Sequence, residues 1–201
     1  EAQYGQELKP PETYDEFDQQ IQFFGEMDDT YGAWIFMSPF YAKWPFLRRL
    51  LARGRLPFDD NMEPNINNED GIGVLENLKA IKPYNHPNAT SEGYTTQYAD
   101  YAQGNTYAAY SWPSFSKYIN NPENSEIAGA DEWQLAKVPG REVDGTMIRP
   151  CSFTFSWSYV VNSYSEVTDL AYLYSQWMYS PSVSEEAIPA DGGYFDPFRE
   201  N

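Results

Sequence analysis

Short apolar runs, each followed within two residues by a proline, alternate along this chain with longer segments of helical periodicity. The runs at 32–37, 106–112 and 133–138 are predicted to be strands, because they are short, apolar and bounded by turn residues. Helices are expected between these runs and after the last of them. Strands separated by helices pair into a largely parallel or mixed sheet, so the sequence predicts an α/β architecture.

Several helix starts can be read from their capping residues. Thr13 and Glu16 have the spacing of a capping box, which predicts a helix to about Gly25. Asn67 or Asn68 is expected to cap a helix in which three apolar residues share one face: Ile72, Leu75 and Leu78.

Later in the chain, Ser165 is expected to cap a helix over 166–179, with four side chains directed inward: Leu170, Leu173, Trp177 and Met178. Ser38-Pro39 is expected to open a helix that ends near Gly54, with Trp44 in the core.

Acidic residues dominate the charge. The chain has 13 Lys and Arg against 30 Asp and Glu, a net charge of −17. This balance excludes most nucleic-acid binders, which need a basic face, and disfavours docking on anionic lipid. No run is long enough to span a bilayer, so direct membrane insertion is not expected.

Aromatic residues make up 17% of the chain, with 6 Trp, 17 Tyr and 12 Phe. Tyr and Trp combine an apolar ring with a polar tip, so this excess fits a surface that stacks on a ligand such as a sugar, and fits an aromatic-rich core equally well. The helical spacing of Tyr94, Tyr98 and Tyr101 favours core packing over a binding stripe.

The residues that usually carry metal or catalytic chemistry are scarce. Cys151 is the one cysteine and is expected to be buried and inert, while the single histidine, His86, is interpreted as a loop residue. The acidic segment containing Asp59, Asp60 and Glu63 lacks the spacing of an EF-hand and is interpreted as a solvated loop. No catalytic residue, metal ligand or cofactor is therefore predicted.

Four groups of motifs, taken in order, resemble family 1 extracellular solute-binding proteins of ABC importers, the maltose-binding-protein type. They are Pro11 to Phe17; Phe58-Asp59-Asp60 with Asn65 to Glu69 and Leu75 to Leu78; Tyr101 to Trp112; and Val138-Pro139-Gly140, Asn162 to Glu166, Gly193-Tyr194 and Pro197-Phe198-Arg199. None is specific alone, but their order over about 11–199 is unusual for chance matches.

The resemblance implies a periplasmic-binding-protein type II-like lobe, a mixed sheet flanked by helices. Residues 10–147 correspond to most of the C-terminal lobe, and 148–201 to a hinge and the segment that returns to the other lobe. Such proteins are roughly twice this length, with ligand bound between two lobes. We therefore expect the chain to be a fragment that lacks much of the N-terminal lobe and the C-terminal end.

The function implied by this resemblance is binding, not catalysis. The protein is expected to bind a small solute, most simply a carbohydrate or polyol, and to deliver it to an ABC transporter membrane permease. It would be periplasmic or extracellular, with a lipid anchor at a missing N-terminus as one possibility.

A sugar-binding site needs aromatic rings that stack on the C–H faces of the sugar and polar groups that form hydrogen bonds with its hydroxyls. The resemblance points to aromatic residues at three places and to two charged residues in the last landmark: Phe40, Tyr41, Trp112, Phe155, Trp157, Asp196 and Arg199. Relatives often carry glycines where Phe155 and Ser156 stand, which predicts a narrower pocket here. Trp112 also fits a core position, and Asp196 with Arg199 also fits a surface ion pair.

Two other functions remain open on the sequence. The acidic surface suits a protein-interaction module that recognises a basic partner. Aromatic and carboxylate side chains also build glycoside hydrolase sites, although no nucleophile or general-acid motif is present. A polyamine or a metal chelate is a further candidate solute, given the negative charge.

Overall fold

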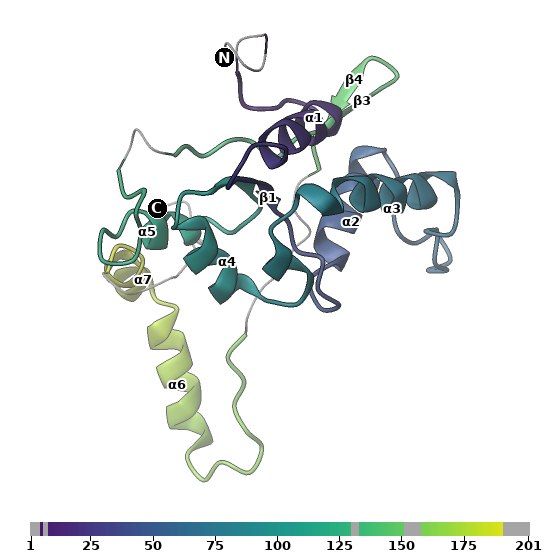
Figure 1. Cartoon of the computed structure of the whole chain (residues 1–201). Helices are drawn as coiled ribbons and strands as arrows, with labels where there is room; N and C mark the ends of the chain where they lie inside the picture. The colour runs from purple at the N-terminus through teal and green to yellow at the C-terminus, as the bar shows by residue number, and fades with distance from the viewer. Residues whose placement is uncertain (1–4, 6–7, 130–132, 151–157, 191–201) are drawn as a thin grey trace. The chain divides into compact units, whose positions relative to one another are not determined.

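A computed structural model describes Gly5 and residues 8–129, 133–150 and 158–190 (Figure 1). The chain divides into two compact units. The larger unit contains Glu1–Ser111 and Tyr118–Ser152, and the smaller contains Trp112–Lys117 and Phe153–Asn201.

Two short parallel strands organise the larger unit. β1 (Tyr31–Trp34) pairs with β2 (Thr106–Ala109), and Trp34 lies opposite Ala109 in the register. The strands are shorter than the predicted runs at 32–37 and 106–112, because pairing stops where the chain turns toward the next element. In a parallel pair both carboxyl ends lie at the same edge, and here this edge is followed by Ile35 and Tyr110.

The predicted capping box and length of the helix that precedes β1 are confirmed. In α1 (Tyr14–Gly25), the Glu16 amide donates to Thr13 Oγ1 at 3.2 Å, and the Thr13 amide donates to Glu16 Oε2 at 3.2 Å. The helix approaches β1 closely, since a side chain at Gly32 would overlap the carbonyl oxygen of Ile21. This contact fixes one helix of the covering layer against the strand pair.

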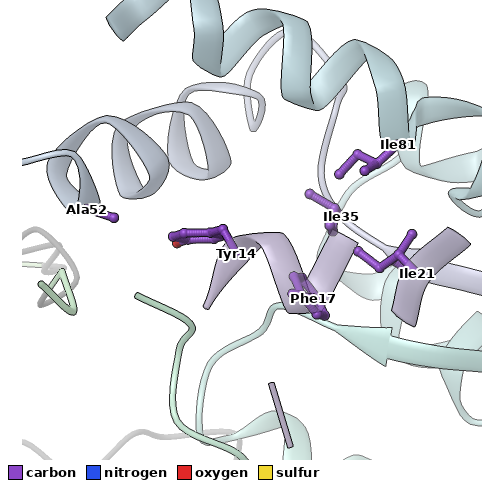
Figure 2. Packing of buried hydrophobic residues seen from close by; sticks show 7 residues of the cluster. Tyr14, Phe17, Ile21, Ile35, Ala52 and Ile81 are labelled. Atoms are coloured by element: carbon purple, nitrogen blue, oxygen red, sulfur yellow. The ribbon is translucent and has the colours of Figure 1, made fainter. Parts of the chain in front are cut away.

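The core of the larger unit lies between β1 and three helices, α1, α2 (Lys43–Ala52) and α3 (Glu69–Ile81). Figure 2 shows Ile21 of α1, Ile35 just after β1 and Ile81 of α3 grouped together. The buried cluster consists of Tyr14, Phe17, Ile21, Ala33, Ile35, Ala52 and Ile81. Trp44 is also buried, which confirms its predicted core position.

Two of the expected helix details differ. α2 begins at Lys43 instead of Ser38-Pro39, because residues 38–42 form turns before the helix. In α3, Asn68 is the cap as predicted, but Ile72 and Leu75 are exposed. The buried face of α3 is formed by Gly71, Val74 and Ile81, with Leu78 packed at its edge.

Shorter elements complete the larger unit. η1 (Lys82–Tyr84) and η2 (Pro87–Thr90) lead to α4 (Tyr94–Tyr101), which buries Tyr98 as predicted while Tyr94 is exposed. α5 (Phe115–Ile119) follows β2, and its residues up to Lys117 belong to the smaller unit. β3 (Arg141–Val143) and β4 (Thr146–Ile148) form an antiparallel hairpin.

The predicted strand at 133–138 is wrong. Residues 133–138 have no regular secondary structure, and Leu135 is exposed. No strand among the described residues pairs with this segment, so its apolar side chains have no sheet to join.

The smaller unit contains α6 (Thr168–Met178) and α7 (Pro181–Ala187). α6 begins at Thr168 with Val167 at its N-cap, so the predicted helix start at 166 with Ser165 as the cap is wrong. Ser165 Oγ accepts from the Val167 amide at 3.2 Å in the turn ahead of the helix. The expected inward packing of α6 is wrong for the described residues. Leu170, Leu173 and Trp177 are exposed, and α6 has no buried residue.

Candidate functional site

An aromatic cluster follows the carboxyl end of β1. The rings of Phe36 and Tyr41 stack at 4.7 Å with an angle of 21° between their planes. Phe40 packs edge-on against Tyr41 at 4.9 Å and against Trp44 at 5.9 Å. The structure thus brings the two predicted residues Phe40 and Tyr41 into contact, and 61% of Phe40 is exposed. An exposed ring on a buried aromatic base is suited to stacking on a ligand.

Backbone hydrogen bonds hold the segment that carries these rings. The Met37 amide donates to the Ala89 carbonyl at 2.8 Å, and Ser38 Oγ donates to the Glu92 carbonyl at 3.1 Å. The amides of Tyr41 and Ala42 both donate to the Ser38 carbonyl. The turn at 38–42 is therefore tied to η2 and to the start of α4, which gives the rings a defined position.

Gly93 provides the space for Tyr41. A Cβ atom on Gly93 would lie 3.1 Å from Tyr41 Cε2 and 3.2 Å from its hydroxyl oxygen. A side chain at Gly93 would therefore require the Tyr41 ring to shift by a few tenths of an ångström. The sequence reasoning missed this residue because the contact joins segments that are about fifty positions apart.

One cation lies on this cluster. Lys43 Nζ is 4.2 Å from the centroid of the Phe40 ring and 5.4 Å from that of Trp44. A cation over an aromatic face is a favourable arrangement, and it stabilises Phe40 in its exposed position.

Of the remaining predicted site residues, Trp112 is the one that lies in the described part of the chain. Trp112 is half-buried, belongs to the smaller unit and comes three residues after β2 ends. The other four lie outside the described residues, as does Cys151: Phe155, Trp157, Asp196 and Arg199.

A buried polar network supports the same edge of the strand pair. Asp100 Oδ2 accepts from Trp34 Nε1 at 2.9 Å and from Asn88 Nδ2 at 3.1 Å. His86 Nδ1 accepts from the Asn88 amide at 3.3 Å and lies 3.3 Å from Asp100 Oδ2. Burial lowers the pKa of His86, and the nearby Asp100 carboxylate opposes this shift.

His86 lies in the short loop between η1 and η2, as predicted, and the structure adds that it is buried and caps η2. The capping position next to Pro87 was the signal available in the sequence.

A groove of about 350 Å³ lies between α1 and α3. Asp15, Gln19 and Gln22 line one side, and Asn77 and Tyr84 lie on the other. None of the predicted ligand residues lines it, so this groove is separate from the aromatic cluster.

The acidic loop matches its sequence interpretation. Asp59 Oδ1 accepts from the amides of Asn61 and Glu63, both at 2.9 Å, and the loop is exposed. Within the described ranges, no three His, Cys, Asp or Glu side chains come close enough together to hold a metal ion. None of the helices in the described part of the chain is long and apolar enough to cross a membrane.

Comparison with solved structures identifies the fold of this chain. No protein-family model matches the sequence, and no curated protein matches it. Among solved structures, an ABC transporter solute-binding protein from Agrobacterium radiobacter K84 in complex with ribitol matches 93% of the chain. Its TM-score is 0.77 at 16% sequence identity. The described chain has a solute-binding-protein fold.

Two further solute-binding proteins of ABC transporters support this fold. One from Thermotoga lettingae TMO, bound with α-D-tagatose, has a TM-score of 0.74 at 23% identity over 92% of the chain. One from Agrobacterium vitis S4, with bound D-mannitol, has a TM-score of 0.67 at 16% identity over 92% of the chain. The α/β class and the solute-binding fold predicted from the sequence are therefore confirmed.

The chain spans less than half of each of these structures, from 44% to 46% of their length. In open α/β sheets, ligands bind outside the carboxyl ends of the strands. The aromatic cluster lies directly after the carboxyl end of β1, which makes it the candidate site of this fold.

Proposed function

We propose that this chain is part of a two-lobed, family 1 solute-binding protein of an ABC importer, and that it binds a sugar or polyol. The observation that carries the proposal is the similarity of its fold, over 92–93% of the chain, to three solute-binding proteins. The compounds bound to those proteins are ribitol, D-mannitol and α-D-tagatose, all of them small and rich in hydroxyl groups.

The exposed face of α6 supports the existence of a second lobe. Leu170, Leu173 and Trp177 are all more than half exposed on one helix. Soluble proteins rarely leave such a patch uncovered. Another part of the full-length protein would bury it, as expected for a segment that returns to the other lobe.

The proposed solute contacts are stacking contacts and hydrogen bonds. Phe40 and Tyr41 would offer a ring to the C–H face of the solute, supported by the stack of Tyr41 on Phe36. Trp112 would offer a second ring after β2. Phe155, Trp157, Asp196 and Arg199 keep their predicted roles as ligand residues, with the two charged groups directed to hydroxyls.

Binding of this kind needs no catalytic group, and the three similar structures are binding proteins rather than enzymes. Closure of two lobes on the solute would present it to a membrane permease. The same proposal places the protein in the periplasm or outside the cell, with any lipid anchor on a preceding segment.

The test is a titration of the full-length protein with ribitol, D-mannitol and D-tagatose, followed by tryptophan fluorescence. We expect saturable binding of at least one compound and a loss of about tenfold or more in affinity for Phe40→Ala or Trp112→Ala, since each would remove a ring that stacks on the solute. Leu56→Ala and Trp133→Ala are matched controls, because neither side chain belongs to the aromatic cluster.

A folded protein that binds none of these compounds would contradict the proposal. Turnover of an aryl glycoside would instead favour the hydrolase function, and salt-sensitive binding of a basic protein would favour the interaction module.

A further inference from the structure

Exposed apolar side chains are concentrated in one stretch of the larger unit, on the loop after α2 and on the outer side of α3. Each of them is between 41% and 72% exposed. Single exposed apolar residues are common, but a concentration of this kind marks a surface that another molecule covers. We refer to these residues together as the loop–helix face: Leu56, Phe58, Met62, Ile66, Ile72 and Leu75.

The loop is folded back on the start of α3, so both parts of the loop–helix face belong to one region of the molecule. Figure 1 shows the loop between α2 and the N-terminal end of α3. The Asn65 amide donates to the Pro57 carbonyl at 2.8 Å, and Asn68 Nδ2 donates to the Asn65 carbonyl at 3.0 Å. Gly71 lies so close to Ile66 that a Cβ atom at Gly71 would overlap the Ile66 carbonyl oxygen.

The two α3 residues of the face lie on the side of the helix that the core does not use. Ile72 and Leu75 are three positions apart, so they are neighbours on one side of α3. The buried side is formed by Gly71, Val74 and Ile81. The helix therefore has apolar residues on two sides, and packing within the larger unit accounts for only one of them.

Met62 is the most exposed residue of the face, at 72%, and its backbone has a φ of +63°. Side chains other than glycine rarely adopt this conformation. Asp59 holds the turn, since its Oδ1 accepts from the amides of Asn61 and Glu63 and its carbonyl accepts from the Met62 amide at 3.0 Å. A flexible apolar side chain on a fixed backbone is well suited to contact a partner, because little ordering is needed on binding.

Negative charge borders the loop–helix face. Asp70 is paired with Arg53 and Arg55, but the other exposed carboxylates of this stretch form no ion pair within the described part of the chain. Lys79 is the one cation of residues 56–81. The unpaired carboxylates are Asp60, Glu63, Glu69 and Glu76.

This combination restricts what can cover the face. A partner has to bury the apolar side chains and also supply positive charge, since carboxylates buried without a cation are unfavourable. Apolar residues bordered by solvated charges are typical of interfaces between proteins that associate and dissociate. The matching surface is therefore a protein segment that carries apolar side chains together with Lys or Arg.

We propose that the loop–helix face docks the protein on the membrane permease of the importer, through a permease segment of this composition. The identity of the partner rests on the proposed function, whereas the surface is assigned from its own exposed residues. The net charge of −17 supports a basic segment on the permease, because anionic lipid repels an acidic protein and a local positive charge offsets that repulsion.

The test uses the full-length protein and the permease in nanodiscs of phosphatidylcholine, with empty nanodiscs as the blank. Met62→Ser combined with Leu75→Ser removes two apolar contacts, and we expect it to weaken permease binding about tenfold or more. Tryptophan fluorescence should show unchanged solute affinity, and the unfolding midpoint should not fall, because both side chains are exposed. Leu135→Ser is the matched control, since Leu135 is also 72% exposed in the larger unit but lies outside the face.

Charge is tested by a second pair of variants. Asp60→Lys combined with Glu63→Lys should weaken permease binding about tenfold or more and remove most of its salt dependence. Glu123→Lys combined with Glu126→Lys makes the same change of charge at exposed acids elsewhere in the larger unit, and it should change permease affinity by less than about threefold.

The outcomes separate this inference from the proposed function. If the face variants bind the permease as the native protein does, or if the Glu123 and Glu126 variant weakens binding equally, docking through this face is overturned and solute binding stands. A dimer that Leu75→Ser dissociates in sedimentation, or an unfolding midpoint that Leu75→Ser lowers in the full-length protein, would also overturn it, because a second copy or another part of the chain would then cover the face. If the full-length protein binds none of ribitol, D-mannitol and D-tagatose, the proposed function itself fails.

Discussion

Helices α1 and α6 have similar sequence patterns and opposite environments. Both carry large apolar side chains at helical spacing. In α1 the apolar stripe contains Tyr14, Phe17 and Ile21, and all three are buried in the core of the larger unit. In α6 the corresponding stripe is exposed along its whole length.

This difference shows that periodicity defines an apolar face but not what covers it. The α1 face is covered because β1, α2 and α3 are all present in the same unit. The α6 face has no such covering within the described residues, and we attribute its burial to another part of the full-length protein. Each prediction below tests whether stability in this chain is concentrated around α1.

The largest effect is expected from the polar side of α1. Asp18→Ala leaves Arg49 buried with its charge unpaired, which should lower the free energy of unfolding by about 3–5 kcal/mol. Urea denaturation followed by far-ultraviolet circular dichroism measures the change. Asp15→Ala is the matched control, because Asp15 is an exposed acid on the same helix, and it should change stability by less than about 0.5 kcal/mol.

Equal effects of Asp15→Ala and Asp18→Ala would show that the Arg49 pair is not the anchor of α1. Asp18→Asn provides a second check. It keeps one acceptor for Arg49 and should recover part of the loss.

The next largest effect is expected when the apolar faces of α1 and α6 are compared directly by substitution. Ile21→Ala removes a fully buried side chain from α1 and should cost about 2–4 kcal/mol. Leu173→Ala removes a side chain that is 58% exposed on α6, and in the 201-residue chain it should cost less than about 0.5 kcal/mol. Denaturation curves of both variants measure the difference.

The same two substitutions can be compared again in the full-length protein. There Leu173→Ala should become costly, about 2 kcal/mol or more, if a second lobe buries the α6 face. A negligible cost in both forms would mean that this face stays in solvent. The helices α1 and α6 would then be similar in sequence pattern alone.

The helix caps were the part of the fold that could be predicted well from the sequence. The capping box of Thr13 and Glu16 and the cap at Asn68 involve residues within one helical turn, so a short stretch of sequence is sufficient. The face of α3 was assigned wrongly because apolar residues occur on both sides of that helix, and only packing on α1 and α2 decides between Leu75 and Val74. The strand at 133–138 failed for a related reason, since a strand needs a partner.

Some residues of the candidate site could likewise be predicted from the sequence, and others could not. Phe40 and Tyr41 were predicted from the family resemblance, and the structure adds their contact with each other. Gly93 was missed because its role depends on Tyr41, which is far away in the sequence.

The smallest effect is a pH dependence that belongs to the larger unit alone, because His86 is the one histidine of the chain. Burial lowers its pKa in the folded state below the value of about 6.5 in the unfolded chain. The unfolded state therefore binds the proton first as the pH falls. The stabilisation is complete above about pH 6.5 and is lost progressively below it, toward the lower pKa of the folded state.

Urea midpoints measured between pH 8 and pH 5.5 should decrease over this window in the native chain. His86→Gln should flatten the decrease, because glutamine can accept from the Asn88 amide without binding a proton. The decrease should also appear as a loss of the near-ultraviolet signal of Trp34, which shares Asp100 with the His86 network. An unchanged slope in His86→Gln would assign the pH dependence to carboxylates, and the buried network around β1 would then not be its source.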